Sequence, residues 1–214
     1  MLKKSIIPLG IIIFLSCTIC LASEKNLKLV QSFEIQIHSN ISPFIFRLVA
    51  HPDDERISQI EVLKKGDPTI LQVLESRMDD KPYQNADYFQ AKDFNFDGYK
   101  DIRLMIMWGA TGNVIYDYWT FDPIKNIFVF HKALSSIYGD PIINYETKEL
   151  STFLRGGMVG KVYTRNTYKF MNSDLILVRQ EKQDWIQEKK HFIRIIRERN
   201  NGELKTVKEE IIDK

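Results

Sequence analysis

The chain is poor in cysteine, and both of its cysteines lie near the amino end. Cys17 and Cys20 fall inside a short apolar leader, and the remainder of the 214 residues contains none. A chain cut after that leader has neither a disulfide framework nor thiol chemistry, which excludes the class of small disulfide-rich secreted domains. Some other device, such as a bound metal ion, would have to rigidify its loops.

The chain also lacks an excess of charge of one sign. It contains 30 Lys and Arg residues against 28 Asp and Glu residues, and Lys3 and Lys4 belong to the leader. Without those two lysines the counts are equal, so the mature net charge is near zero. Nucleic-acid binding needs a clustered positive field. The basic stretch 189–199 is flanked or interrupted by Glu188 and Glu198 and is typical of a solvated face, so we expect no nucleic-acid partner.

Long hydrophobic runs are limited to the amino end. Lys3 and Lys4 precede the apolar segment Ile6–Leu15, which suits a signal peptide and is shorter than the roughly 20 residues of a membrane span. Cys20 and Ala22 are the small residues of a cleavage site. We therefore predict a signal peptide over 1–22 and export to the periplasm or beyond, with an uncleaved anchor helix as the alternative.

Leu15-Ser16-Cys17 is a loose lipobox, which gives a second export hypothesis. Lipid on Cys17 would tether the mature chain to a membrane, although Phe14 is a poor residue at its position in such a motif. We expect a membrane association only in that case.

The mature chain, 23–214, has short apolar segments rich in β-branched and aromatic residues, with turn signals about every ten residues. This pattern predicts a single all-β, mainly antiparallel domain, either propeller-like or an irregular sandwich built from hairpins, with at most short helices. Four hairpin turns are expected at 64–68, 122–126, 172–174 and 200–202. A short helix near 134–138 and a helical alternative for 205–213 stay open.

Segment 93–101 has the pattern of a calcium loop. The predicted ligands are Asp93, Asn95, Asp97, the backbone carbonyl of Tyr99, and Asp101. Calcium takes six to eight oxygen ligands, and alternate side chains on a tight loop can converge on one point while glycine allows the sharp turn. The alternative is a polar turn whose Asx side chains bond to the backbone. Crowded like charges favour calcium over that alternative, and ligand chemistry favours it over magnesium.

The loop, the strand after it and the strand ending Phe121-Asp122-Pro123 resemble the calcium loops of FG-GAP and integrin-type propeller repeats. They are more similar to a group of bacterial exported proteins with one such loop, and the similarity extends over about 57–179, including Gln72 and Arg155-Gly156-Gly157. That group includes an immunity protein that inhibits the lysozyme-like effector of its own type IV secretion system. The resemblance implies a propeller-like β fold, a calcium ion, and binding of a peptidoglycan hydrolase.

Residues 50–55, Ala-His-Pro-Asp-Asp-Glu, match the zinc signature of N-acetylglucosaminyl deacetylases. There His51 and Asp54 would bind zinc and Asp53 would act as the base. A hydrolytic zinc site needs three protein ligands, and the later histidines, His131 and His191, stand alone. A Pro-Asp turn between strands is the simpler interpretation, so we expect no enzyme activity.

The predicted function is therefore that of an exported calcium-binding protein that acts by binding another protein. The alternatives are the zinc deacetylase and a calcium-stabilised envelope module without an inhibitory role. Aromatic and arginine side chains are the best anchors of protein interfaces. The candidates for partner contact are Tyr116, Tyr118, Trp119 and Arg155.

Overall fold

The computed structural model describes residues 27–79, 81 and 87–212. The predicted signal peptide, with its cleavage position and Cys17, lies outside these residues. The described chain contains fourteen β-strands and two short 3-10 helices. Within each sheet, strands that follow one another in sequence pair antiparallel. The prediction of an antiparallel all-β fold is confirmed. Within the described residues there is no helix of the length and apolarity that a membrane crossing requires.

The strands form three sheets, each a simple meander in chain order. Sheet 1 comprises β1 (Lys28–Ile35), β2 (Phe44–Ala50), β3 (Ile57–Lys64) and β4 (Ile70–Glu75). Sheet 2 comprises β5 (Phe89–Lys92), β6 (Asp101–Trp108), β7 (Val114–Asp122) and β8 (Ile127–Phe130). Sheet 3 comprises β9 (Ile142–Asn144), β10 (Glu149–Arg155), β11 (Tyr163–Met171), β12 (Asp174–Ile186), β13 (His191–Asn200) and β14 (Glu203–Ile212).

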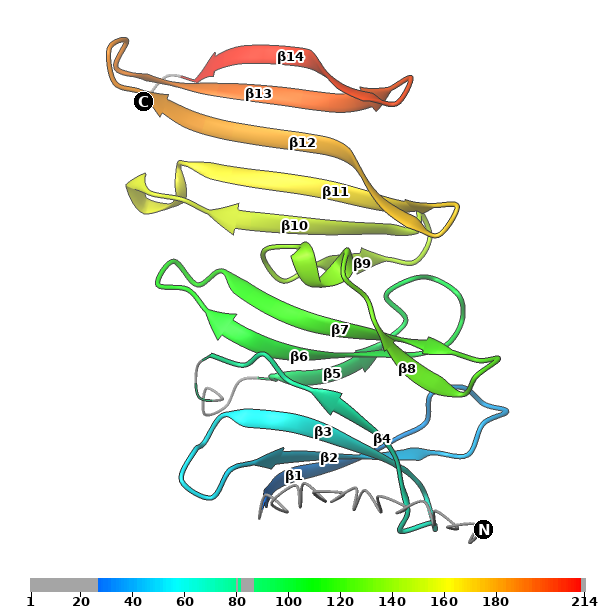
Figure 1. Cartoon of the computed structure of the whole chain (residues 1–214). Coiled ribbons are helices and arrows are strands. Elements are labelled where there is room, and N and C mark those ends of the chain that lie inside the picture. The colour runs from blue at the N-terminus through cyan, green and yellow to red at the C-terminus, as the bar shows by residue number, and fades with distance from the viewer. Residues whose placement is uncertain (1–26, 80, 82–86, 213–214) are drawn as a thin grey trace, which may run out of the picture.

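The sheets follow one another along the molecule, with sheet 2 between sheets 1 and 3 (Figure 1). Successive side chains of a strand point to opposite faces, so β6 supplies two different cores. Ile102 and Leu104 belong to a cluster shared with sheet 1, whereas Met105 belongs to a cluster shared with sheet 3. The mostly apolar sequence of β6 is thus explained by burial on both faces.

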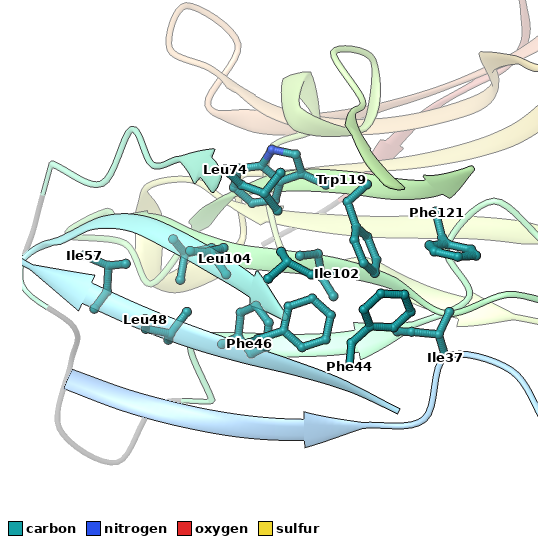
Figure 2. Packing of buried hydrophobic residues seen from close by; sticks show 14 of the residues in the cluster. Ile37, Phe44, Phe46, Leu48, Ile57, Leu74, Ile102, Leu104, Trp119 and Phe121 are labelled. Atoms are coloured by element: carbon teal, nitrogen blue, oxygen red, sulfur yellow. The ribbon is translucent and has the colours of Figure 1, made fainter. Parts of the chain in front are cut away.

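The core between sheets 1 and 2 is rich in phenylalanine. Phe44 and Phe46 of β2 are almost fully buried and point toward β6 and β7 (Figure 2). The ring of Phe44 meets those of Phe121 and Phe128 edge-on at centroid distances of 5.8 and 5.7 Å. Burying one such side chain contributes about 1.5–3 kcal/mol, so this cluster supplies much of the attachment between the two sheets.

Gln72 adds a polar link between the same two sheets. From β4 its side-chain amide donates to the carbonyl oxygen of Phe128 at 2.7 Å, and its side-chain oxygen accepts the Phe128 backbone N–H at 2.9 Å. One side chain therefore satisfies both backbone groups of a residue on β8. Sheets 1 and 2 are consequently joined by two hydrogen bonds as well as by hydrophobic packing.

The core between sheets 2 and 3 contains Phe94, Tyr118 and Leu150, all nearly inaccessible to solvent. The first 3-10 helix, Leu134–Ser136, lies against this core. The predicted short helix near 134–138 is therefore present as a single 3-10 turn.

All four predicted hairpin turns are confirmed. They join β3 to β4, β7 to β8, β11 to β12, and β13 to β14. In the last of them Asn201 and Gly202 have φ values of 49° and 84°, the left-handed conformation that Asn-Gly tolerates. The helical alternative for 205–213 is wrong, since β14 extends through Ile212, with Asp213 outside the described residues.

Candidate metal centre

Loop 93–101 connects β5 to β6 as the turn of a hairpin in which Lys92 pairs with Asp101. Two of its residues have left-handed backbone conformations, Phe96 with φ 63° and Gly98 with φ 93°. An L side chain is strained at the second of these angles, so glycine is required there although space around it is open. Gly98 therefore allows the sharp turn of the loop, as the sequence pattern predicted.

The side chains of Asp93, Asn95 and Asp97 turn inward along the loop. The Asp93 carboxylate accepts the backbone N–H groups of Asp97 at 3.2 Å and Gly98 at 2.9 Å. The Asn95 amide oxygen also accepts the Asp97 N–H, at 3.1 Å, and its NH2 group donates to the Asp97 carboxylate at 2.8 Å. Asp97 in turn accepts the Tyr99 N–H at 2.9 Å. Three of the predicted ligands are thus brought together.

Asp101 closes the loop from inside the protein and is completely buried. Its two carboxylate oxygens accept the backbone N–H groups of Phe94 at 2.9 Å and Phe121 at 3.0 Å. Burial raises the pKa of Asp101 to about 7, the two hydrogen bonds oppose that rise, and the charges of Asp97 and Asp93 add to it. A carboxylate in this position is costly to ionise without a nearby cation.

Aromatic contacts fix the loop between the two cores. Phe94 is fully buried and meets Tyr118 edge-on at a centroid distance of 5.0 Å. The Tyr99 ring lies 4.7 Å from that of His38, and the Lys100 N–H donates to the Ile37 carbonyl at 3.1 Å. The Phe96 ring lies 6.4 Å from that of Phe170 on β11, so the loop contacts all three sheets.

The donor set suits calcium by chemistry, with three carboxylates, one amide oxygen and the predicted Tyr99 carbonyl. Among residues 27–79, 81 and 87–212, no three His, Cys, Asp or Glu side chains are gathered as a ready metal cluster. The carboxylates are held instead by backbone N–H groups, as in the Asx-turn alternative. A calcium ion in this loop would be held by Asp93, Asn95, Asp97 and Asp101 and by the Tyr99 carbonyl, in exchange for some of these hydrogen bonds.

Residues 50–55 form a turn that leads into β3. The Asp54 N–H donates to the His51 carbonyl at 3.0 Å. The Asp54 carboxylate is held by the Arg56 guanidinium, with contacts of 3.0, 2.9 and 2.7 Å. Hydrogen bonding to Arg56 lowers the pKa of Asp54 to about 2. One of the two zinc ligands expected from the deacetylase signature is thus paired with an arginine.

Three of the four predicted partner anchors are core residues. Tyr116, Tyr118 and Trp119 are 3%, 1% and 3% exposed, so the prediction that they form a contact surface is corrected. They lie on β7, the third strand of the central sheet, whose two faces are both covered. Arg155, at the end of β10, is exposed and stays a candidate.

Sequence reasoning missed two buried charges in sheet 2. Arg103 is 2% exposed and lies over the Tyr116 ring at 3.9 Å, with an ion pair to Asp140 at 2.8 Å. Asp117 is fully buried and is paired with the Arg77 guanidinium. The signal in the sequence that could have indicated them was a single charged residue within an otherwise apolar part of each strand.

The pair formed by Arg77 and Asp117 lines a cavity of about 380 Å³ between the edges of sheets 1 and 2. Arg77 also lies over the Phe130 ring at 5.0 Å. The buried acid at this edge is therefore neutralised within the chain.

The fold and the loop define an all-β protein of three antiparallel sheets with an Asp-rich turn between β5 and β6. No family model matches the chain, and no curated protein matches it significantly. A solved structure described as "Structure of a Xanthomonas Type IV Secretion System related protein" is similar, with a TM-score of 0.48 and 20% identity over 85% of this chain and 87% of that chain. At these values the similarity does not carry the other protein's biology to this chain.

Proposed function

We propose that this chain is an exported calcium-binding protein that acts by binding another protein, and that its target is a lysozyme-like peptidoglycan hydrolase. The observation that carries the calcium part is the crowding of acidic groups in loop 93–101. Asp93 and Asp97 raise the pKa of the buried Asp101 further than burial alone. A divalent cation would relieve this repulsion and leave all three carboxylates ionised.

Calcium in this position would stiffen the whole molecule. The loop contacts Tyr118 through Phe94 and sheet 1 through Tyr99 and Lys100. Binding to the folded state alone stabilises it by RT ln(1 + [L]/Kd), about 2.7 kcal/mol at a hundred times the Kd. A stiff scaffold loses little conformational entropy when it binds a partner, which favours inhibition by a rigid surface without chemistry of its own.

The protein-binding part is supported by the resemblance of the loop and its following strands to exported immunity proteins. The experiment is an inhibition assay with the mature chain, a panel of purified lysozyme-like hydrolases and a peptidoglycan suspension, in calcium and in chelator. We expect inhibition in calcium that weakens after chelation. Calcium binding without inhibition of any hydrolase would leave the envelope-module alternative. A preference for zinc, with release of acetate from N-acetylglucosamine polymers, would favour the deacetylase.

A further inference from the structure

The connection between β10 and β11, residues 156–162, carries near its middle the most exposed apolar side chain of the described chain. Val159 is 106% exposed and its neighbour Met158 is 47% exposed. Hydrophobic residues at the tip of a hairpin are not needed for the core, which in this region is formed by Leu150 and its neighbours. We call residues 155–162 the apolar tip.

The backbone of the apolar tip is strained. Met158, Val159 and Gly160 have consecutive left-handed φ values of 56°, 56° and 81°. For an L-residue other than glycine this conformation costs roughly 1–2 kcal/mol, and a β-branched side chain is an outlier there. Strain of this kind persists where the surroundings enforce it, and it concentrates at binding and functional sites.

The base of the tip is held by hydrogen bonds at both of its ends. The Asn113 side chain accepts the Arg155 N–H at 2.9 Å and donates to the Arg155 carbonyl at 2.9 Å. The Gln183 side chain of β12 donates to the Lys161 carbonyl at 2.8 Å. The Gly156 N–H donates to the Val162 carbonyl at 2.8 Å, and a Cβ on Gly156 would meet Val162 at 2.7 Å. These contacts fix the base of the tip relative to sheet 3.

The charged residues within the apolar tip have one sign. Arg155 and Lys161 flank Met158 and Val159, and segment 155–162 contains no acidic residue. The described residues place no ion-pair partner on the Arg155 guanidinium. The Lys161 ammonium lies 5.7 Å from the Phe192 ring. An apolar point between two cations is complementary to a concave, acidic site.

We propose that the apolar tip is the segment that enters the target, with Met158 and Val159 filling an acid-lined cleft and Arg155 and Lys161 facing its carboxylates. This rests on the proposed function. Glycoside hydrolases that cleave peptidoglycan place two carboxyl groups on either side of the scissile bond, so their cleft has the chemistry that this tip matches. The predicted calcium loop lies at the other end of the strands (Figure 1) and would act on the scaffold only.

The experiment compares variants of the full mature chain. The double change Met158→Asn and Val159→Asn removes the apolar surface. Asparagine tolerates left-handed φ, so the backbone conformation can be kept. Ile124, which is 94% exposed in the β7–β8 turn at the opposite end, provides the matched control Ile124→Asn. The contribution of charge is tested by the charge reversal Lys161→Glu. Its control is Lys125→Glu, because the Lys125 side chain is 69% exposed in the same turn as Ile124.

The readouts are inhibition of a purified c-type lysozyme and of bacterial lytic muramidases on peptidoglycan, together with the melting temperature. We expect the tip double variant to weaken inhibition at least tenfold with an unchanged or higher melting temperature, and both controls to stay within twofold of the wild type. Wild-type inhibition that the tip variants retain would overturn this inference and leave the proposed function standing. A wild-type chain that inhibits none of the hydrolases would overturn the proposed target class and this inference with it.

Discussion

The carboxylate of Asp101 accepts a hydrogen bond of 3.0 Å from the backbone N–H of Phe121, across the β6–β7 pair and in the absence of solvent. Its other oxygen accepts the Phe94 N–H. One side chain thus satisfies two buried backbone donors, on the loop and on a central strand. Asp101 has a structural role that does not depend on a metal ion.

The change Asp101→Ala should therefore destabilise the protein even in chelator. Each buried donor that loses its partner costs about 1–3 kcal/mol, so the expected loss for the two donors is about 2–6 kcal/mol in urea unfolding. Asp101→Asn, which keeps one acceptor oxygen, should lose less. A free energy of unfolding for Asp101→Ala within about 0.5 kcal/mol of the wild type would show that water replaces the carboxylate.

Gln72 should behave as part of the backbone pairing between sheets 1 and 2. Gln72→Ala removes the partner of both the N–H and the carbonyl of Phe128, with an expected loss of about 2–3 kcal/mol. Gln72→Glu has the same shape but offers a carboxylate to the Phe128 carbonyl in place of a donor, and it should also destabilise. If Gln72→Glu unfolds like the wild type, the donated hydrogen bond is not needed.

The two partners of the ion pair between Arg103 and Asp140 should contribute unequally to the free energy of unfolding. Arg103 is buried against Tyr116, whereas the Asp140 side chain is 57% exposed. Arg103→Ala leaves a cavity beside the rings of Phe94, Tyr116 and Tyr118 and should cost about 2–4 kcal/mol. Asp140→Asn keeps an oxygen that can accept from the guanidinium, and it should cost less than Arg103→Ala. Equal losses in urea unfolding would contradict this assignment.

His131 should give the stability a pH dependence. Its Nδ1 accepts the Leu134 N–H at 3.1 Å, and its ring lies 5.8 Å from that of Phe170. Burial lowers the pKa of His131 below its ordinary value, so the unfolded chain takes up this proton first as pH falls. The stability contribution of the neutral ring is present above pH 6.5, the ordinary value, and is lost as pH falls through the folded pKa.

The check is urea unfolding above and below that window for the wild type and for His131→Asn, whose side-chain oxygen can still accept the Leu134 N–H. We expect a smaller loss of stability at the acidic pH in the variant. An equal loss in the two proteins would assign the acid sensitivity to other groups.

Local patterns account for the parts of the fold that were predicted. The short strands rich in β-branched and aromatic residues and the Asn200–Gly202 turn follow from local propensity and from residues that tolerate positive φ. The order of strands within each sheet follows because consecutive hairpins leave no long crossover. The spacing in 93–101 likewise identified which side chains would meet.

What the sequence did not provide depends on long-range packing. Tyr116, Tyr118 and Trp119 have the composition of an interface, and only the covering of sheet 2 on both faces makes them core residues. The sequence analysis did not identify the apolar tip. The exposure of Met158 and Val159 depends on how the base of the tip is held, and one of its partners, Asn113, is distant in sequence. Exposure is a property of the assembled sheets and is not visible in a local pattern.

The most direct test of the account is calorimetric titration of calcium into the chelator-treated mature chain, repeated for Asp97→Ala. Asp122→Ala is the matched control, because Asp122 also accepts two turn N–H groups, at 3.0 Å each, in the β7–β8 turn that has no calcium pattern. We predict one calcium ion per chain for the wild type and for Asp122→Ala, with a higher melting temperature when bound, and loss of both effects in Asp97→Ala. No stoichiometric calcium in the wild type, or an Asp97→Ala variant that unfolds like the wild type in calcium buffer, would contradict the account.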